Sequence, residues 1–392
     1  MSVPRRTILS WAFYDWANSA FSTTVIAGFF PIFFKSYWGS GLPATESTRW
    51  LGYSLSVSAL LVALIGPFLG AMADQAGTKK RSLVIFTALG TASTAGLAFV
   101  GEGNWQLAAM LYVLATIGFL CSIIFYDSLL VGITDEKSVD VVSARGYALG
   151  YLGGGILFAV NAFAASSPET FGLSGKVEAV KLAFLTVAVW WAVFAVPVFL
   201  FVREPPVPDG GARGRSWLRA AFAQPFETFR HIRAVRPAFL FLIAYWLYID
   251  GVDTVVRMAV DYGLSLGFAA DGLMTALLVT QLVGFPAALV FGRLGERHGP
   301  KFGIGLAILV YLLTIAWASQ MRSEAEFYVL AVVIGLVQGG IQSLSRSLFA
   351  RLNQKASLAL DFKGSPAAAK ISPGWPLSST WLTSTGRAGL SM

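Results

Sequence analysis

Long apolar stretches separated by short polar segments run through most of the chain. Windows of about 20 apolar residues, the length that crosses the hydrocarbon core of a bilayer, recur about ten times. The expected spans are 10–36, 51–73, 82–101, 106–131, 146–166, 179–202, 238–260, 270–293, 302–321 and 326–350. Because spanning segments must satisfy their own backbone hydrogen bonds, this pattern predicts an all-α integral membrane protein.

Composition agrees with that prediction and removes several classes of function. The 392 residues are 56% hydrophobic and only 13% charged, with a mean hydropathy of +0.66. One cysteine, Cys121, and two histidines, His231 and His298, supply neither a disulfide framework nor a zinc centre, so no metal is expected. No glycine-rich loop ends in the lysine and hydroxyl residue of a phosphate loop, so we expect no enzyme site and no cofactor.

The net charge of +8 is distributed unevenly. Basic residues gather at the N-terminus and in the segments 79–81, 203–236 and 293–301, which fall on one side if the chain weaves regularly. Cytoplasmic loops of membrane proteins carry such an excess, so the N-terminus is predicted to be cytoplasmic. The same distribution argues against nucleic-acid binding.

A loop motif occurs twice, each time between two apolar spans. Both copies place glycine, an acid, glycine and then a base in the same order. The residues are Gly70, Asp74, Gly77, Lys79, Lys80 and Arg81 in the first copy and Gly292, Glu296, Gly299 and Lys301 in the second. Such a repeat indicates a duplicated membrane protein and favours transport, with these loops acting on the conformational gate.

The region between the sixth and seventh spans divides the chain. Its beginning is rich in proline, glycine and arginine, a composition that is typical of a linker. Phe222, Phe226 and Phe229 then recur at helical spacing among bases, which predicts a short helix on the membrane surface. The expected units are a six-helix lobe at 1–202, the basic linker at 203–237, a four-helix lobe at 238–351 and an irregular tail at 352–392.

Polar residues inside the spans are the candidates for a substrate or proton pathway, because charge in a membrane is costly unless it has a role. Asp15 and Asn18 share one face of span 1, where they either bind solute or brace neighbouring helices. Span 7 carries a charged face formed by Asp250, Asp253, Arg257 and Asp261. Asp253 can pair with Arg257 along the helix, whereas Asp250 has no base four residues later and is the candidate for reversible protonation.

Span 10 presents two amides and a guanidinium on one face, from Gln338, Gln342 and Arg346. An arginine there can hold a carboxylate by two parallel hydrogen bonds, which suits an amino acid. Alternatively, Arg346 reaches the membrane surface or pairs with another helix. For Asp127 in span 4 and Arg145 at the start of span 5, an ion-pair gate between helices is favoured over contact with solute.

Other side chains have structural explanations. Gly146, Gly150 and Gly154 form a ridge that lets span 5 approach a neighbour closely. Lys35 is expected to extend outward to the membrane surface. Aromatic side chains near span ends are expected to anchor there, namely Trp11, Trp16, Tyr37, Trp38, Trp50, Trp105 and Trp317.

The duplicated loop resembles the signature loop of the major facilitator superfamily. Further motifs resemble the branch of that superfamily that includes the fungal vacuolar amino-acid effluxer of autophagy and its bacterial relatives. They begin at Trp11, Tyr126, Arg145, Asp250 and Gly339, and the resemblance runs from about Ser10 to about Arg351. It implies a two-lobed, alternating-access transporter in which helices 1, 4, 7 and 10 line the cavity.

The resemblance ends near residue 352. Relatives in the superfamily have twelve helices, whereas the segment 352–392 has no apolar run long enough to span. The abrupt change in composition is typical of a truncation or a shifted reading frame, and a soluble tail is the alternative. In the superfamily, the acid of the first loop meets the N-terminal end of helix 11, so Asp74 would lack that partner.

These observations together predict a secondary transporter of small organic solutes, with amino-acid efflux or exchange implied by the resemblance. Its expected partners are the solute, protons and the lipid bilayer of a bacterial inner membrane, and a monomer is expected. The alternative is a membrane protein that does not transport, either an accessory or receptor-like partner or a non-functional truncated product.

Overall fold

The computed structural model describes residues 4–135, 138–204 and 236–361. Within these ranges the side chains of 44, 74–76, 236–238, 257 and 353–361 are not described. All regular secondary structure in the described part is helical. The predicted surface helix of the linker and the end of the predicted tail lie outside the described residues.

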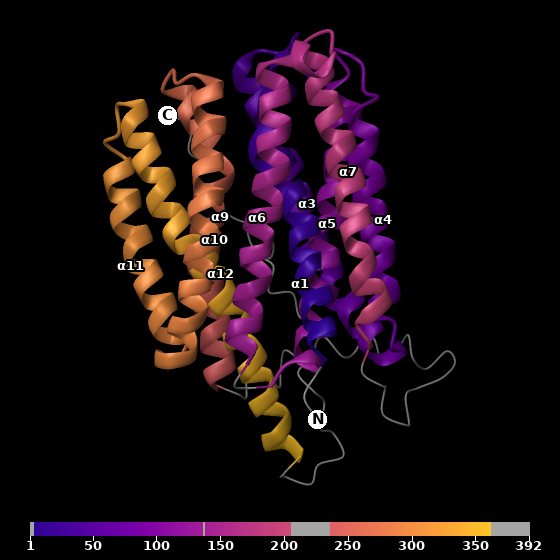
Figure 1. Ribbon diagram of the computed structural model, residues 1–392, viewed down its shortest axis with the longest axis vertical. Helices are drawn as coiled ribbons and strands as arrows, with labels where there is room; N and C mark the ends of the chain where they lie inside the picture. Colours follow the sequence, from indigo (N-terminus) through magenta and orange to yellow (C-terminus); the bar gives the residue numbers. More distant parts are fainter. Residues whose placement is uncertain (1–3, 136–137, 205–235, 362–392) are drawn as a thin grey trace.

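The long helices run side by side along one common direction (Figure 1). The first half contains α1 (Arg5–Ala20), η1 (Phe21–Phe29), α2 (Phe30–Phe33), η2 (Phe34–Trp38), α3 (Ala44–Ala76), α4 (Lys79–Leu97), α5 (Trp105–Ile133), α6 (Val139–Ser166), η3 (Pro168–Phe171) and α7 (Lys176–Phe201). The second half contains α9 (Arg236–Ser265), α10 (Ala270–His298), α11 (Pro300–Ala318) and α12 (Glu324–Asp361).

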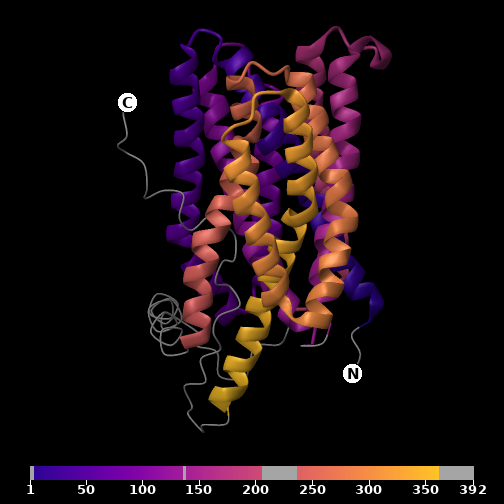
Figure 2. The ribbon, with the colours of Figure 1, turned by 90° about the vertical axis from the view of Figure 1, so that its left-hand side faces the viewer.

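Each predicted span falls on one of these helical segments. Nine helices in the described ranges are long and apolar enough to cross a membrane. The tenth, α4, begins with Lys79, Lys80 and Arg81, which shorten its apolar stretch, and it packs against α5 and α7. Helix α12 projects beyond its neighbours and ends at Asp361, so the start of the predicted irregular tail is helical (Figure 2).

The first span is continuous from Arg5 to Trp38 but is not uniformly α-helical. Two stretches, η1 and η2, have the wider π-helical winding. Local π-helical turns are uncommon and concentrate at functional sites, because the extra residue per turn re-aims neighbouring side chains. The apolar pattern of span 1 did not predict this winding, and η1 forms part of the cavity described below.

The two copies of the repeated loop both turn on glycine. Gly77 ends α3 with φ 62°, and Gly299 separates α10 from α11 with φ 81°, a left-handed region that favours glycine. Just after the turn at Gly77, the backbone nitrogens of Lys79 and Lys80 donate hydrogen bonds to the carboxylate of Glu204, at 2.8 Å and 3.3 Å. This carboxylate, which follows α7, satisfies the exposed donors at the positive end of α4.

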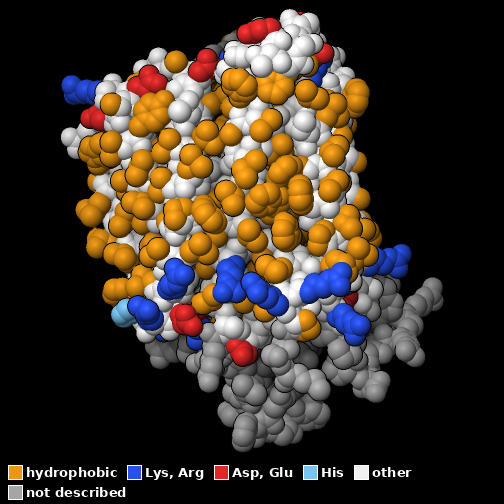
Figure 3. All heavy atoms as spheres, in the orientation of Figure 1, with side chains coloured by type: hydrophobic (Ala, Val, Ile, Leu, Met, Phe, Trp, Pro, Cys, Tyr) orange, Lys and Arg blue, Asp and Glu red, His pale blue; other side chains and the backbone are white. Residues whose placement is uncertain are grey.

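The two halves meet along α6, which packs against α1 in its own half and against α10 and α12 in the other. On the face shown in Figure 3, apolar side chains form a broad band, and lysine and arginine gather below it. That end also holds the N-terminus and the turn between α10 and α11 (Figure 1). It is called the basic end below.

Candidate functional site

A cavity of about 200 Å³ lies between the two halves. It is lined by α1, η1, α5 and α6 from the first half and by α9, α10 and α12 from the second. The four spans that the resemblance implied, here α1, α5, α9 and α12, are therefore all present. Helices α6 and α10 complete the walls.

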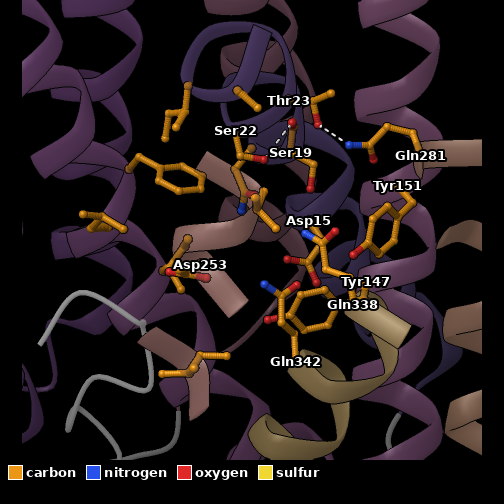
Figure 4. A pocket seen from close by; sticks show the side chains of 18 of the residues that line it. Asp15, Ser19, Ser22, Thr23, Tyr147, Tyr151, Asp253, Gln281, Gln338 and Gln342 are labelled. Atoms are coloured by element: carbon orange, nitrogen blue, oxygen red, sulfur yellow. Dashed lines mark hydrogen bonds between the residues drawn. The ribbon is translucent and has the colours of Figure 1, made fainter. Parts of the chain in front are cut away.

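The cavity wall is rich in polar groups (Figure 4). Its ionisable and amide side chains are Asp15, Asn18, Asp127, Asp253, Gln281, Gln338, Gln342 and Arg346. Hydroxyl groups come from Ser19, Ser22, Thr23, Thr280, Tyr147, Tyr151 and Tyr245. This wall can hydrogen-bond a small polar solute from several sides, whereas within the described ranges no His, Cys, Asp and Glu side chains group in a way that would hold a metal ion.

Seven of the nine predicted pathway residues line this cavity, and Asp250 on α9 is not among the lining residues. The stripe of α9 that faces the cavity is formed by Ile249, Asp253 and Val256. Asp250 is rotated about 100° from Ile249 around the helix, and it is half-buried away from the cavity wall. The side chain of Arg257 lies outside the described residues, so its expected pairing with Asp253 stays a prediction.

Arg346 of α12, which lines the cavity, connects the two halves. It forms ion pairs with Asp15 of α1 and Asp127 of α5, both at 3.1 Å, although its side chain is only 4% exposed. It also donates hydrogen bonds to the hydroxyl oxygen of Ser143 at 2.9 Å and to the Ser143 carbonyl oxygen at 2.8 Å. Of the alternatives for Arg346, the observed one is pairing with other helices, and surface exposure is wrong because the charge is buried and neutralised locally.

Aromatic rings enclose this ion pair. The Arg346 guanidinium lies 4.8 Å from the ring centroid of Trp11 and 4.3 Å from that of Tyr147. Trp11 stacks on Tyr126 with centroids 4.4 Å apart, and the Tyr126 hydroxyl donates to Asp15 at 2.8 Å. The prediction that Trp11 anchors at the membrane surface is therefore wrong, because its ring is fully buried where it packs against the charge network.

The glycine ridge of α6 faces α1, as close packing requires. At Gly146 the reason is specific, since a methyl group there would overlap a carboxylate oxygen of Asp15 and lie 3.0 Å from the guanidinium of Arg346. At Gly154 it would lie 2.9 Å from the carbonyl oxygen of Ser19. The ridge therefore leaves room for the ion pair as well as for the backbone of α1.

A second ion pair ties α6 to α12 nearer the basic end. Arg351 pairs with Asp140, whose side chain is fully buried. Neither residue was predicted to have a role, because each lies outside the limits of its predicted span.

The residues predicted to act on the conformational gate differ in their exposure to solvent. Gly70 is buried in α3, Lys79 and Lys80 are half-buried, and Arg81, Arg145, Glu296 and Lys301 are exposed. Gly292 lies against Ala144 of α6, so it allows α10 to approach α6 closely. The side chain of Asp74 is not described. For Asp127, the ion-pair partner is Arg346, and Arg145 extends to the surface.

Different contacts join the halves at the opposite end. Lys35 of η2 pairs with Asp261 of α9, which corrects the expectation that Lys35 extends outward. Lys176 pairs with Asp271 at 3.2 Å on the exposed surface. Within the cavity, Gln281 of α10 donates a hydrogen bond to the hydroxyl of Thr23 at 3.0 Å.

Comparison with known proteins gives the family. The family described as "Vacuole effluxer Atg22 like" matches residues 44–355. An uncharacterised MFS-type transporter of Bacillus subtilis, YxiO, is 38% identical over 356 residues, which are 88% of this chain and 81% of that protein. Autophagy-related protein 22 is 25% identical in both Saccharomyces cerevisiae and Coccidioides immitis, across 76% of this chain. The chain spans 65% and 62% of those two fungal proteins, less than two thirds of their length.

Solved structures show the same fold at low sequence identity. The human organic anion transporter MFSD10 has a TM-score of 0.59 and 15% identity, with 96% of each chain covered. The proton:xylose symporter XylE of the major facilitator superfamily has a TM-score of 0.55 and 16% identity, covering 96% of this chain and 91% of XylE. The chain is thus a multi-pass membrane protein, and it belongs to the vacuole effluxer Atg22-like family of major facilitator transporters.

Proposed function

We propose that this protein is a secondary transporter that exports or exchanges amino acids or similar small organic solutes. Family membership supports membrane transport, and the name of the family favours efflux. The observation that carries the proposal is a small polar cavity between two halves that are joined by a buried charge network. Typical ligand pockets have volumes of roughly 300–1,000 Å³. A cavity of about 200 Å³ therefore suits a solute smaller than the ligands that such pockets bind.

The transport cycle we infer is alternating access by two lobes, residues 1–202 and 238–351, which move about the cavity. Opening the basic end requires Arg346 to leave Asp15 and Asp127, and Arg351 to leave Asp140. Closing that end re-forms the same pairs. The conformational equilibrium is therefore coupled to the charge state of these carboxylates.

Protons are the coupling ion we propose. The described side chains that line the cavity include the carboxylates of Asp15, Asp127 and Asp253 and the guanidinium of Arg346. Burying several like charges in a low dielectric is costly, so binding a proton or a cationic group lowers that cost. We assign proton binding to Asp253 before Asp250, because Asp253 lines the cavity and is only 8% exposed.

We further propose that the protein acts as a monomer in a bacterial inner membrane with its N-terminus in the cytoplasm. The basic end, which holds the N-terminus, is then the cytoplasmic end. Solute would be loaded from that side during efflux. Cysteine-accessibility labelling at exposed Arg81 and at exposed Glu102 tests this orientation, since only one of the two sites should react with an impermeant reagent in intact cells.

The function is tested by reconstitution into proteoliposomes with labelled amino acids. Wild-type protein should accumulate solute when a pH gradient is imposed and should also exchange solute without a gradient. Asp253→Asn should abolish gradient-driven accumulation and keep exchange, since it removes a titratable group and leaves a side chain of nearly the same size in the cavity wall. Asp250→Asn, three residues away on the same helix, is the matched control and should keep both.

The outcomes separate the parts of the proposal. Gradient-driven accumulation in Asp253→Asn equal to wild type would reject proton binding at Asp253. Wild-type protein that moves no amino acid in a broad panel would reject the substrate class, and movement of another solute in that panel would replace it.

A further inference from the structure

Two buried polar groups in the cavity wall have no hydrogen-bond partner among the described residues. They are the amide nitrogen of Asn18 on α1 and the hydroxyl of Tyr151 on α6. Both residues are buried, with exposed fractions of 3% for Asn18 and 7% for Tyr151. Several other buried side-chain atoms of the described residues also lack a partner, but only these two belong to residues that line the cavity, where a bound solute can supply the partner that buried polar groups normally have.

The position of Tyr151 is determined by a slot in the other half of the molecule. A Cβ atom at Gly284 of α10 would lie 2.7 Å from the tyrosine ring, and one at Gly339 of α12 would lie 2.6 Å from it. Both glycines are therefore needed for the ring to enter between α10 and α12. Ala148 and Ala288 pack against it in the same small cluster. The ring is fixed by packing, and its hydroxyl points toward the side of the cavity where Asp15 and Gln338 lie (Figure 4).

The guanidinium of Arg346, which was predicted to bind a carboxylate of the solute, already donates hydrogen bonds to protein groups. Arg346 donates to Asp15, Asp127 and both oxygens of Ser143. A solute that took Arg346 in this conformation would have to displace a protein carboxylate. A solute at Asn18 and Tyr151 displaces no protein group.

We propose that Asn18 and Tyr151 form the subsite that binds the acceptor oxygens of the solute, the carboxylate in the case of an amino acid. A carboxylate accepts hydrogen bonds and donates none, so it suits the amide and hydroxyl donors. The negative charge of nearby Asp15 is partly offset by Arg346 at 3.1 Å, and the proton proposed for Asp253 would offset a further charge, so that an anionic group can bind beside them. This inference rests on the proposed function, because it takes the cavity as the solute site.

The test is equilibrium binding to the purified full-length protein, with L-amino acids each paired with the amine that lacks the carboxylate, such as L-alanine with ethylamine. Tyr151→Phe keeps the ring in its slot and removes the hydroxyl. It should weaken binding of the amino acid about tenfold or more, the effect of losing a hydrogen bond to a charged group, and leave binding of the amine unchanged. Asn18→Ala should act in the same direction.

Tyr311→Phe is the matched control. The hydroxyl of Tyr311 is also buried without a partner in the described ranges, but Tyr311 is not among the residues that line the cavity and instead lines a separate groove between α9 and α11. This variant should bind both members of each pair like wild type. A second readout is the melting temperature without solute, which should not fall in Tyr151→Phe, because the lost hydroxyl makes no hydrogen bond within the protein.

The inference is overturned if Tyr151→Phe and wild type bind the amino acids equally, or if the solute-free melting temperature falls in Tyr151→Phe as it would for a hydroxyl that is paired within the protein. It is overturned together with the proposed substrate class if wild-type protein binds no amino acid. The first two outcomes leave amino-acid transport intact, so the two failures are distinguishable.

Discussion

The two halves of the molecule are joined by ion pairs at both ends of the cavity, and the pairs at the two ends differ in burial. At the basic end, Arg346 is 4% exposed and contacts three helices of the other half, and Asp140, the partner of Arg351, is fully buried. At the opposite end, the side chains of Lys176 and Asp271 are 53% and 66% exposed. The pair of Lys35 and Asp261 is intermediate, with exposures of 26% and 16%.

This difference predicts which end opens more easily from this conformation. Removing one partner of a buried ion pair costs about 3–5 kcal/mol, because the other charge is left in a low dielectric. An exposed pair contributes about 0–1 kcal/mol, since water solvates both charges after they separate. We therefore expect the basic end to be the more firmly closed, and four substitutions test the comparison.

The largest effect is expected for Arg346→Met. It leaves the carboxylates of Asp15 and Asp127 buried without their counter-charge, so unfolding free energy should fall by about 3–5 kcal/mol. Flux in proteoliposomes should be lost. Arg346→Lys is the control, and it should recover part of the stability because it restores charge without the bidentate fork. If Arg346→Met had the melting temperature and flux of wild type, the buried network would not be what closes the basic end more firmly.

The next effect is expected for Gly146→Ala, which changes no charge. The added methyl group would overlap Asp15 and crowd Arg346, so stability should fall by about 1–3 kcal/mol and flux should drop. Gly251→Ala on α9 is the matched control, since a methyl group there meets open space. That control should be neutral or more stable than wild type because alanine favours helix. Equal melting temperatures for the two variants would contradict the close packing of α6 on the ion pair.

A smaller effect is expected for Lys35→Gln at the opposite end. The partner, Asp261, is only partly buried, so the loss of stability should stay near 1 kcal/mol. Because the change weakens only this end, exchange should become faster or shift in its dependence on solute concentration. The measurement is the initial rate of exchange against solute on each side. A stability loss as large as that of Arg346→Met would erase the difference between the two ends.

The smallest effect is expected for Lys176→Gln. This exposed pair should contribute less than about 0.5 kcal/mol at physiological salt, where screening is strong. Melting temperature and exchange rate should match wild type, and added salt should change wild type and variant alike. A clear loss of exchange would mean that Lys176 and Asp271 act in closing the opposite end.

Much of the fold and part of the site followed from local pattern. Asp15 and Asn18 were expected to share a face of span 1, and Gln338, Gln342 and Arg346 a face of span 10, and all five line the cavity. Helical periodicity is enough for such statements, because it fixes which residues of one helix point the same way. It is not accurate enough to choose between Asp250 and Asp253, which differ by a rotation of about 60°.

The sequence by itself determined the helical spans, the repeated turns on Gly77 and Gly299 and the gathering of bases at one end, since these depend on residue type and neighbours along the chain. Only the tertiary structure decided the partners. Arg346 lies far along the chain from Asp15, and the slot for Tyr151 is made by glycines on two other helices. Periodicity gives the direction of a side chain within its helix, whereas its partner depends on how separate helices pack, which no local pattern contains.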